Sequence, residues 1–321
     1  MIARFDARQW GSGQAVGDVI GLRGGDYRAD IDRTGAGLRA LTWRGRDVVW
    51  PYGAEGPRAF QGQVLAPWPN RLTGEGYRFN GVRYLLEPDE PATGTAIHGL
   101  VHDRTWTPES VSEDTATLSL DFAGTTGFPF PLSLSLTYRL TAEGLTVTAT
   151  ARNEGDSPAP FGLGFHPYLT LGEPLGVLAG RGELLLESSA GTWQPVDERM
   201  LPSGDPVPVE GSEYDFRAPG RELGETVLDT AFSSLDRDGD GLAWVRLSGP
   251  RHRVSLWCDR GFGWLQLFSA DTLGGTDHRA HLAVEPMTCP PNALASGTDL
   301  IVLAPGGSTE HTFGITAENL P

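Results

Sequence analysis

Three residues of this chain have side chains suited to acid–base chemistry: His98, His166 and Glu285. His98 lies in TAIHGLVHDRTW, where the next glycine lets the chain turn, and His166 lies among aromatic residues in FGLGFHPYL. An imidazole can donate a proton near neutral pH. Glu285 ends the apolar run of LAVEPM, where burial would raise its pKa toward the range of a general base. Either imidazole could therefore donate a proton, and Glu285 could accept one. Each histidine alone would more often be structural, and Glu285 alone could be an edge carboxylate in water.

A second group of polar residues follows a stiff stretch of chain in LAPWPNRL. Pro67 and Pro69 restrict the backbone around Trp68, so Asn70 and Arg71 extend from a rigid frame. A guanidinium held in this way can present a fixed fork of donors to sugar hydroxyls or to a carboxylate. The alternative is that Arg71 satisfies backbone carbonyls at a strand end, and this segment alone leaves both interpretations open.

Metal and nucleophile chemistry have weaker support in the sequence. His278 and His281 are three apart and precede Glu285, but the residues between them predict a loop entering a strand, not a metalloprotease helix. Residues 236–241 read DRDGDG like a calcium loop, yet Leu247 stands where a bidentate glutamate belongs, so we expect an acidic hairpin turn. The chain has no G-x-S-x-G or G-x-G-x-x-G motif. We therefore expect no metal site, acyl-enzyme or dinucleotide cofactor.

The composition excludes further classes of function. Asp and Glu number 41 against 25 Lys and Arg, and the net charge of −16 argues against nucleic-acid binding. All 25 cations are arginine, so a Schiff-base lysine, a pyridoxal-phosphate anchor and a P-loop lysine are impossible. Cys258 and Cys289 form neither a disulfide framework nor a zinc motif, and the N-terminal residues show no apolar signal segment. We expect a cytoplasmic protein with no membrane partner.

Strands must position the reactive residues, because apolar and polar residues alternate with period two through much of the chain. Three such runs between residues 115 and 152, separated by Gly and Pro, predict an antiparallel meander. Further strands are predicted at 242–249, 252–259, 263–270 and 299–306, whereas the proline-rich residues 191–222 predict an irregular excursion. No window supports a helix longer than about two turns. We predict a single all-β domain over residues 1–321, a large and mostly antiparallel β-sandwich.

Five short motifs resemble, in order and spacing, the aldose 1-epimerase family, whose members are also called galactose mutarotases: PWPNR, IHG…W, GFHPY, LDTAF and VEPMTCPPNA. The resemblance extends from about residue 30 to the C-terminus and implies the β-supersandwich of that family. It also implies an isomerase that interconverts the α- and β-anomers of a free aldohexose without metal, cofactor or covalent intermediate. Its partner would be a small-molecule sugar, and the protein would be a monomer or homodimer.

The resemblance also implies roles for individual residues. Glu285 would be the general base that takes the proton of the anomeric hydroxyl, and His166 the general acid that protonates the ring oxygen. His98 would hold the sugar beside that oxygen and assist. The family's sugar-binding positions correspond here to Asn70, Arg71, Tyr168, Asp229 and Gln266.

Two other functions stay open at the level of sequence. GFHPYL and IHGLVHDRTW depart from the wording of galactose-preferring members and look closer to a bacterial subgroup, so the sugar itself is undetermined. Arg58, Arg71 and Arg104 could form an anion pocket for a phosphorylated or sulfonated hexose. The protein could also be a non-catalytic carbohydrate-binding module, although binding alone does not require an opposed acid and base.

Overall fold

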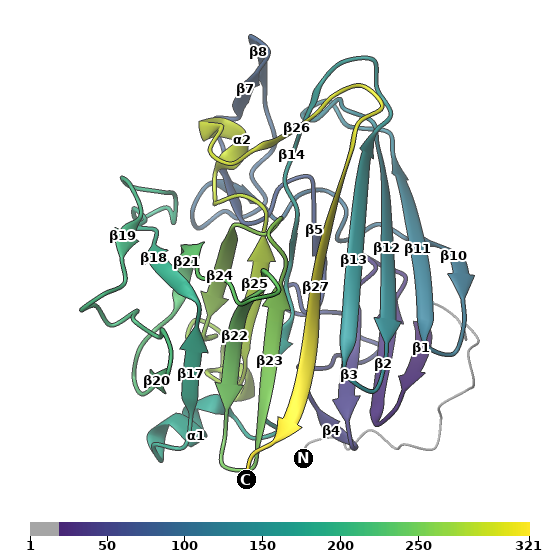
Figure 1. The fold of residues 1–321 in the computed structure, drawn as a ribbon. Coiled ribbons are helices and arrows are strands. Elements are labelled where there is room, and N and C mark those ends of the chain that lie inside the picture. Colours follow the sequence, from purple (N-terminus) through teal and green to yellow (C-terminus); the bar gives the residue numbers. More distant parts are fainter. Residues whose placement is uncertain (1–18) are drawn as a thin grey trace.

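Two large antiparallel sheets form most of the structure, a computed structural model that describes residues 19–321. Figure 1 shows the larger sheet running across the whole molecule. Its nine strands are, in spatial order, β10 (Thr107–Val111), β11 (Thr115–Phe122), β12 (Leu132–Leu140), β13 (Leu145–Asn153), β27 (Ser308–Asn319), β23 (His252–Cys258), β22 (Ala243–Ser248), β17 (Leu185–Ser188) and β20 (Arg221–Glu222).

The predicted meander forms the centre of this nine-stranded sheet. β11, β12 and β13 pair antiparallel in sequence order, and β27 from the C-terminus adds to the edge of β13. The burial of β12 alternates strictly, with Leu132, Leu134, Leu136 and Tyr138 buried and the serines and threonine between them less so. Alternation of this kind places one face of a strand on the core, so the prediction for residues 115–152 is confirmed.

The second large sheet carries the candidate site. Its strands are, in order, β19 (Val207–Pro208), β18 (Ala190–Trp193), β21 (Asp229–Leu235), β24 (Trp264–Phe268), β25 (Leu282–Met287), β15 (Gly164–Phe165) and β5 (Val64–Leu65), and β16 (Tyr168–Leu169) also pairs with β25. All six residues of β25 are buried. A strand buried on both faces lies at the centre of a layered fold, so a charged residue on it needs a partner or a function.

Smaller elements complete the described chain. A four-stranded sheet contains β1 (Val19–Gly24), β2 (Tyr27–Asp32), β3 (Leu38–Trp43) and β4 (Arg46–Asp47). Three two-stranded sheets pair β6 (Arg71–Thr73) with β9 (Thr95–Ile97), β7 (Tyr77–Phe79) with β8 (Val82–Tyr84), and β14 (Ala159–Phe161) with β26 (Ile301–Leu303). The helices are short: α1 (Leu175–Gly180), α2 (Ala293–Ser296) and a 3₁₀ turn at Gly275–Asp277. Within residues 19–321, no helix has the length and apolar character to cross a membrane.

The hydrophobic core divides in a way that marks the site. One large cluster joins the three main sheets through residues such as Leu22, Leu136, Leu256 and Val284. Two small apolar clusters are separate from it, namely Trp50, Tyr168 and Ala283, and Ala231, Trp264 and Met287. On β24 and β25 the pairs Trp264–Met287 and Phe268–Ala283 lie on either side of the pair Gln266–Glu285. A row of polar residues therefore lies between two apolar patches on one face of the eight-stranded sheet.

One detail differs from the expectations, and another lies outside the described residues. Residues 236–241 connect β21 to β22, which belong to different sheets, so they form a crossover turn and not a hairpin. Its Asp238 accepts hydrogen bonds from the main-chain N–H groups of Asp240 and Leu242 and from Trp244 Nε1, so this carboxylate stabilises the turn itself. The N-terminal residues considered for a signal segment lie outside the described part of the chain.

Candidate active site

Three neighbouring strands of the eight-stranded sheet bring together Glu285, Gln266 and Asp229. Gln266 on β24 lies directly opposite Glu285 on β25. Asp229 begins β21 and lies two residues from the partner of Gln266, so its side chain is on the same face. Gln266 Nε2 donates a hydrogen bond to Asp229 Oδ1 at 2.7 Å. The polar row therefore has fixed positions set by strand register.

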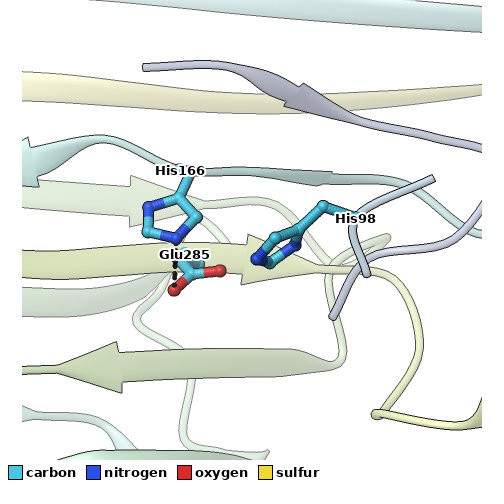
Figure 2. A group of neighbouring side chains, drawn as sticks. All are labelled: His98, His166 and Glu285. Carbon is cyan, nitrogen blue, oxygen red and sulfur yellow. Dashed lines mark ion pairs between the residues drawn. The ribbon is translucent and has the colours of Figure 1, made fainter. Parts of the chain in front are cut away.

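His166 meets Glu285 at the end of this row. The distance from His166 Nε2 to Glu285 Oε1 is 3.3 Å, and both side chains are almost fully buried, 6% and 2% exposed (Figure 2). Burial raises the pKa of Glu285 well above its ordinary value, and the nearby Asp229 raises it further while Arg71 lowers it. Burial also lowers the pKa of His166 to about 3. Both shifts disfavour the charged forms. In the free protein the proton that the pair shares therefore lies on Glu285, and both side chains are neutral.

His98 completes the group from a different segment. It follows β9, and Figure 2 shows its ring beside the Glu285 carboxylate. One ligand atom from each of His98, His166 and Glu285 lies within 4.8 Å of the others, so the three have the composition of a site for a divalent cation. The absence of a metal requirement stays a prediction.

Arg71 is held by a residue that the sequence did not reveal. Its Nε and Nη2 bind the two carboxylate oxygens of Glu90 at 2.7 and 2.8 Å, and Glu90 also accepts hydrogen bonds from the hydroxyls of Thr93 and Thr95. Burial alone would raise the pKa of Glu90, but these hydrogen bonds hold it at about 2. Asn70, just before Arg71, is buried and accepts the Arg71 main-chain N–H at 2.8 Å. The guanidinium is therefore fixed through Nε and Nη2.

Aromatic rings form the wall of the site. Tyr168 stacks on His166 with ring centroids 4.9 Å apart, and its hydroxyl donates to the main-chain oxygen of Ala59 at 3.1 Å. Phe60 packs edge-on against His98 at 4.5 Å and lies parallel to His166 at 6.1 Å. Phe60 is only partly buried, whereas the two imidazoles that it contacts are buried. No motif marked Phe60 in the sequence.

The three arginines considered for an anion pocket are each paired with a carboxylate. Arg71 binds Glu90, Arg58 Nη1 lies 2.7 Å from Asp277 Oδ2, and Arg104 Nε lies 3.6 Å from Asp103 Oδ1. Arg58 and Arg104 are about half exposed. Within the described part of the chain no contact joins the three guanidinium groups. The two histidines considered for a metal site have different partners: His281 stacks on Trp50, and His278 contacts the Asp271 carbonyl.

Several polar atoms in this site are buried without a partner. Glu285 Oε2 and Gln266 Oε1 have no hydrogen-bond partner among the described residues. An unsatisfied buried polar oxygen of an uncharged group costs about 1–3 kcal/mol. Atoms of this kind beside a fixed guanidinium and an aromatic wall fit a ligand with several hydroxyl groups, which would donate to them.

Comparison with known proteins identifies the family. The sequence matches the family model described as aldose 1-epimerase over residues 18–316. The protein belongs to the aldose 1-epimerase family. The match begins at residue 18, earlier than residue 30, where the resemblance of the motifs begins. Membership of the aldose 1-epimerase family makes the protein an isomerase.

Individual relatives agree with this assignment. The chain is 35% identical over 301 residues to the Escherichia coli K12 protein named "Uncharacterized protein YihR", covering 93% of each chain. It is 27% identical over 239 residues to human galactose mutarotase, covering 71% of this chain and 68% of the relative. The solved GalM/aldose epimerase homologue of C. elegans superposes with a TM-score of 0.83 at 20% identity, covering 94% of this chain and 99% of that chain. This likeness confirms the predicted all-β fold.

Proposed function

We propose that this member of the aldose 1-epimerase family interconverts the α- and β-anomers of a free aldohexose by opening and closing the hemiacetal ring. The observation that carries the proposal is the 3.3 Å contact between His166 Nε2 and Glu285 Oε1, two buried groups from distant parts of the sequence with pKa values shifted in opposite directions. An acid and a base at one site are what ring opening requires.

The chemistry needs one proton removed and one delivered. In the free protein the shared proton lies on Glu285, and it first passes to His166 across the 3.3 Å contact. Ionised Glu285 then takes the proton of the C1 hydroxyl while protonated His166 gives its proton to the ring oxygen, and the bond between C1 and that oxygen breaks. The aldehyde rotates, and closure on its other face returns both protons to their original groups. Acid and base each contribute about 10²–10⁴-fold. Glu285 and His166 share one proton throughout. When the sugar ring is open, Glu285 is protonated and His166 is neutral, as in the free protein.

A fixed set of ligands serves this reaction because the rest of the sugar must stay in place while the aldehyde turns. We assign this role to Arg71 Nη1, the Asn70 amide and the Asp229–Gln266 pair, whose positions are fixed by protein hydrogen bonds. Tyr168, whose hydroxyl is already bonded to Ala59, supplies an apolar wall.

The state of the arginines supports a neutral sugar. A phosphate or sulfonate is bound best by a guanidinium that presents two parallel donors, whereas Arg58 and Arg104 face carboxylates and Arg71 gives Nε and Nη2 to Glu90. Galactose is the first sugar to test, because it is named for several relatives.

The proposal is tested by polarimetry of a freshly dissolved anomer with wild-type protein and with His166→Asn. We expect turnover to fall by about 10²-fold or more without the general acid. His278→Asn is the matched control, because His278 is exposed and bonds only a main-chain carbonyl in the described structure. If His166→Asn keeps the wild-type rate, His166 is not the acid and the proposed mechanism is wrong.

A further inference from the structure

His98 and Asn70 hold each other through a reciprocal pair of hydrogen bonds. The main-chain N–H of Asn70 donates to His98 Nδ1 at 3.2 Å, and the main-chain N–H of His98 donates to the Asn70 carbonyl at 3.0 Å. Both residues adopt the left-handed conformation, with φ of 56° for Asn70 and 61° for His98. Non-glycine residues with positive φ are uncommon and persist where the surrounding structure holds them. Both side chains are buried, so the arrangement is not a surface turn.

This contact fixes the chemistry of the ring. A main-chain N–H can only donate, so the nitrogen that receives it must present a lone pair. A neutral imidazole has one N–H and one acceptor nitrogen, and its tautomer is set by the hydrogen bond that one nitrogen makes. With Nδ1 occupied as the acceptor, the single ring proton belongs on Nε2.

We propose that His98 acts as a neutral hydrogen-bond donor, its only ring proton fixed on Nε2 by the main-chain N–H of Asn70 and directed into the sugar site. The fixed tautomer follows from the contact itself, and its use on the sugar rests on the proposed mutarotase function. Figure 2 shows one nitrogen of the His98 ring directed toward the Glu285 carboxylate. The role is distinct from that of His166, because His98 holds an oxygen without transferring a proton.

The groups around His98 keep it neutral. Burial is the main cause that places its pKa well below the ordinary value, and His166, Arg71 and His102 lower it further. The Phe60 ring packs against it at 4.5 Å and excludes water from that side. Glu285 is the acidic group nearby, and its own burial favours the uncharged acid. None of these neighbours in the described chain favours an imidazolium.

The same proton bears on metal binding. A cation held by His98, His166 and Glu285 would need the lone pair of His98 Nε2, which the proposed tautomer covers with hydrogen. Freeing it would move the proton to Nδ1, directly against the Asn70 N–H. The trio therefore suits a hydrogen-bond network better than a metal.

The direct test is long-range ¹H–¹⁵N NMR of the ligand-free protein with ¹⁵N-labelled histidine. The His98 signals are those lost in His98→Asn, a variant that should fold because asparagine tolerates positive φ. We expect His98 to show a protonated Nε2 and an unprotonated Nδ1, unchanged from about pH 5 to about pH 8. A protonated Nδ1, or a signal that titrates in this range, would overturn the proposal.

A kinetic comparison separates this inference from the proposed function. In His98→Asn the new amide lies near the position of Nδ1, whereas the longer glutamine of His98→Gln reaches toward the position of Nε2. His98→Gln should therefore retain more turnover than His98→Asn, which we expect to lose about 10²-fold. Equal loss in two folded variants would refute the donor role. The NMR result needs no catalysis, so a protein with the expected tautomer but no mutarotase activity would reject the proposed function and keep the fixed Nε2 proton.

Discussion

Replacement of Glu285 by glutamine removes the proposed base while disturbing little else. Glutamine has the same shape, and its amide can still donate to His166 Nε2, which lies 3.3 Å from Oε1. Oε2 has no partner in the described structure, so no protein hydrogen bond is lost there. The substitution therefore tests proton transfer and not the integrity of the strand.

The expected loss of activity follows from the role of the group. A positioned general base contributes about 10²–10⁴-fold, which corresponds to about 3–5 kcal/mol of transition-state stabilisation. The binding residues are untouched, so the loss should appear in kcat with little change in KM.

Polarimetry of an aldohexose anomer, corrected for spontaneous mutarotation, measures the effect. Glu310→Gln is the matched control, since it makes the same change at an exposed position of β27. We expect the control to keep full activity. Retention of more than about a tenth of the wild-type kcat by Glu285→Gln would refute the assignment of the base.

The same variant makes a prediction about stability. Burial raises the pKa of Glu285 in the folded protein, so its favourable contribution is present at low pH and is lost as the pH rises through the folded-state value. Glutamine stays neutral at every pH. Glu285→Gln should therefore melt no lower than wild type at pH 8, and its advantage over wild type should shrink on acidification. A variant that melts lower than wild type at both ends of this range would contradict the raised pKa of the buried Glu285 carboxyl group.

Three further outcomes are expected. Glu90→Gln should raise KM about tenfold with a smaller effect on kcat, because it weakens the bidentate contact that fixes Arg71. The dependence of kcat on pH should be flat around neutrality, because the raised pKa of Glu285 and the lowered pKa of His166 widen the range over which the pair holds one proton. Phe60→Ala should lower kcat about tenfold, because the ring packs on both His98 and His166.

Each of these has its own check. For Glu90, the matched control is Glu154→Gln, which changes an arginine-paired but exposed carboxylate, and equal KM values for the two variants would contradict the positioning role. For the pH dependence, a limb centred near the ordinary pKa of histidine would show that His166 titrates as an exposed imidazole. For Phe60, unchanged kcat in a folded variant would exclude a contribution from the ring. When turnover is compared across a panel of sugars, it should be highest with the neutral hexose. A tenfold preference for its 6-phosphate or sulfonate would contradict the proposed neutral substrate.

The alternation of apolar and polar residues predicted many of the strands correctly, because it depends only on the residues within each segment. The runs at 115–152 became β11, β12 and β13 in the expected antiparallel order, and the apolar residues before Glu285 became the buried strand β25. Burial raises the pKa of Glu285, as the apolar run before it predicted. The residues proposed for the proton transfer were found through motifs whose spacing matched a family.

Contacts between distant segments were beyond local pattern. Alternation predicted β22, β23 and β24 but not that the first two join the nine-stranded sheet and the third joins the other. Nothing in EPDEPATGT links Glu90 to Arg71, because their contact forms only after β6 pairs with β9. Phe60 reaches the histidines from a turn with positive φ, a conformation that its sequence does not encode.

Magnetisation-exchange NMR between the anomeric protons of galactose would test the proposed reaction most directly. With wild-type protein, exchange between the α- and β-signals should accelerate in proportion to protein concentration, and Glu285→Gln should abolish the acceleration. Sugar binding by wild-type protein without any acceleration, across a panel of neutral and anionic hexoses, would identify a binding protein and contradict the mechanism.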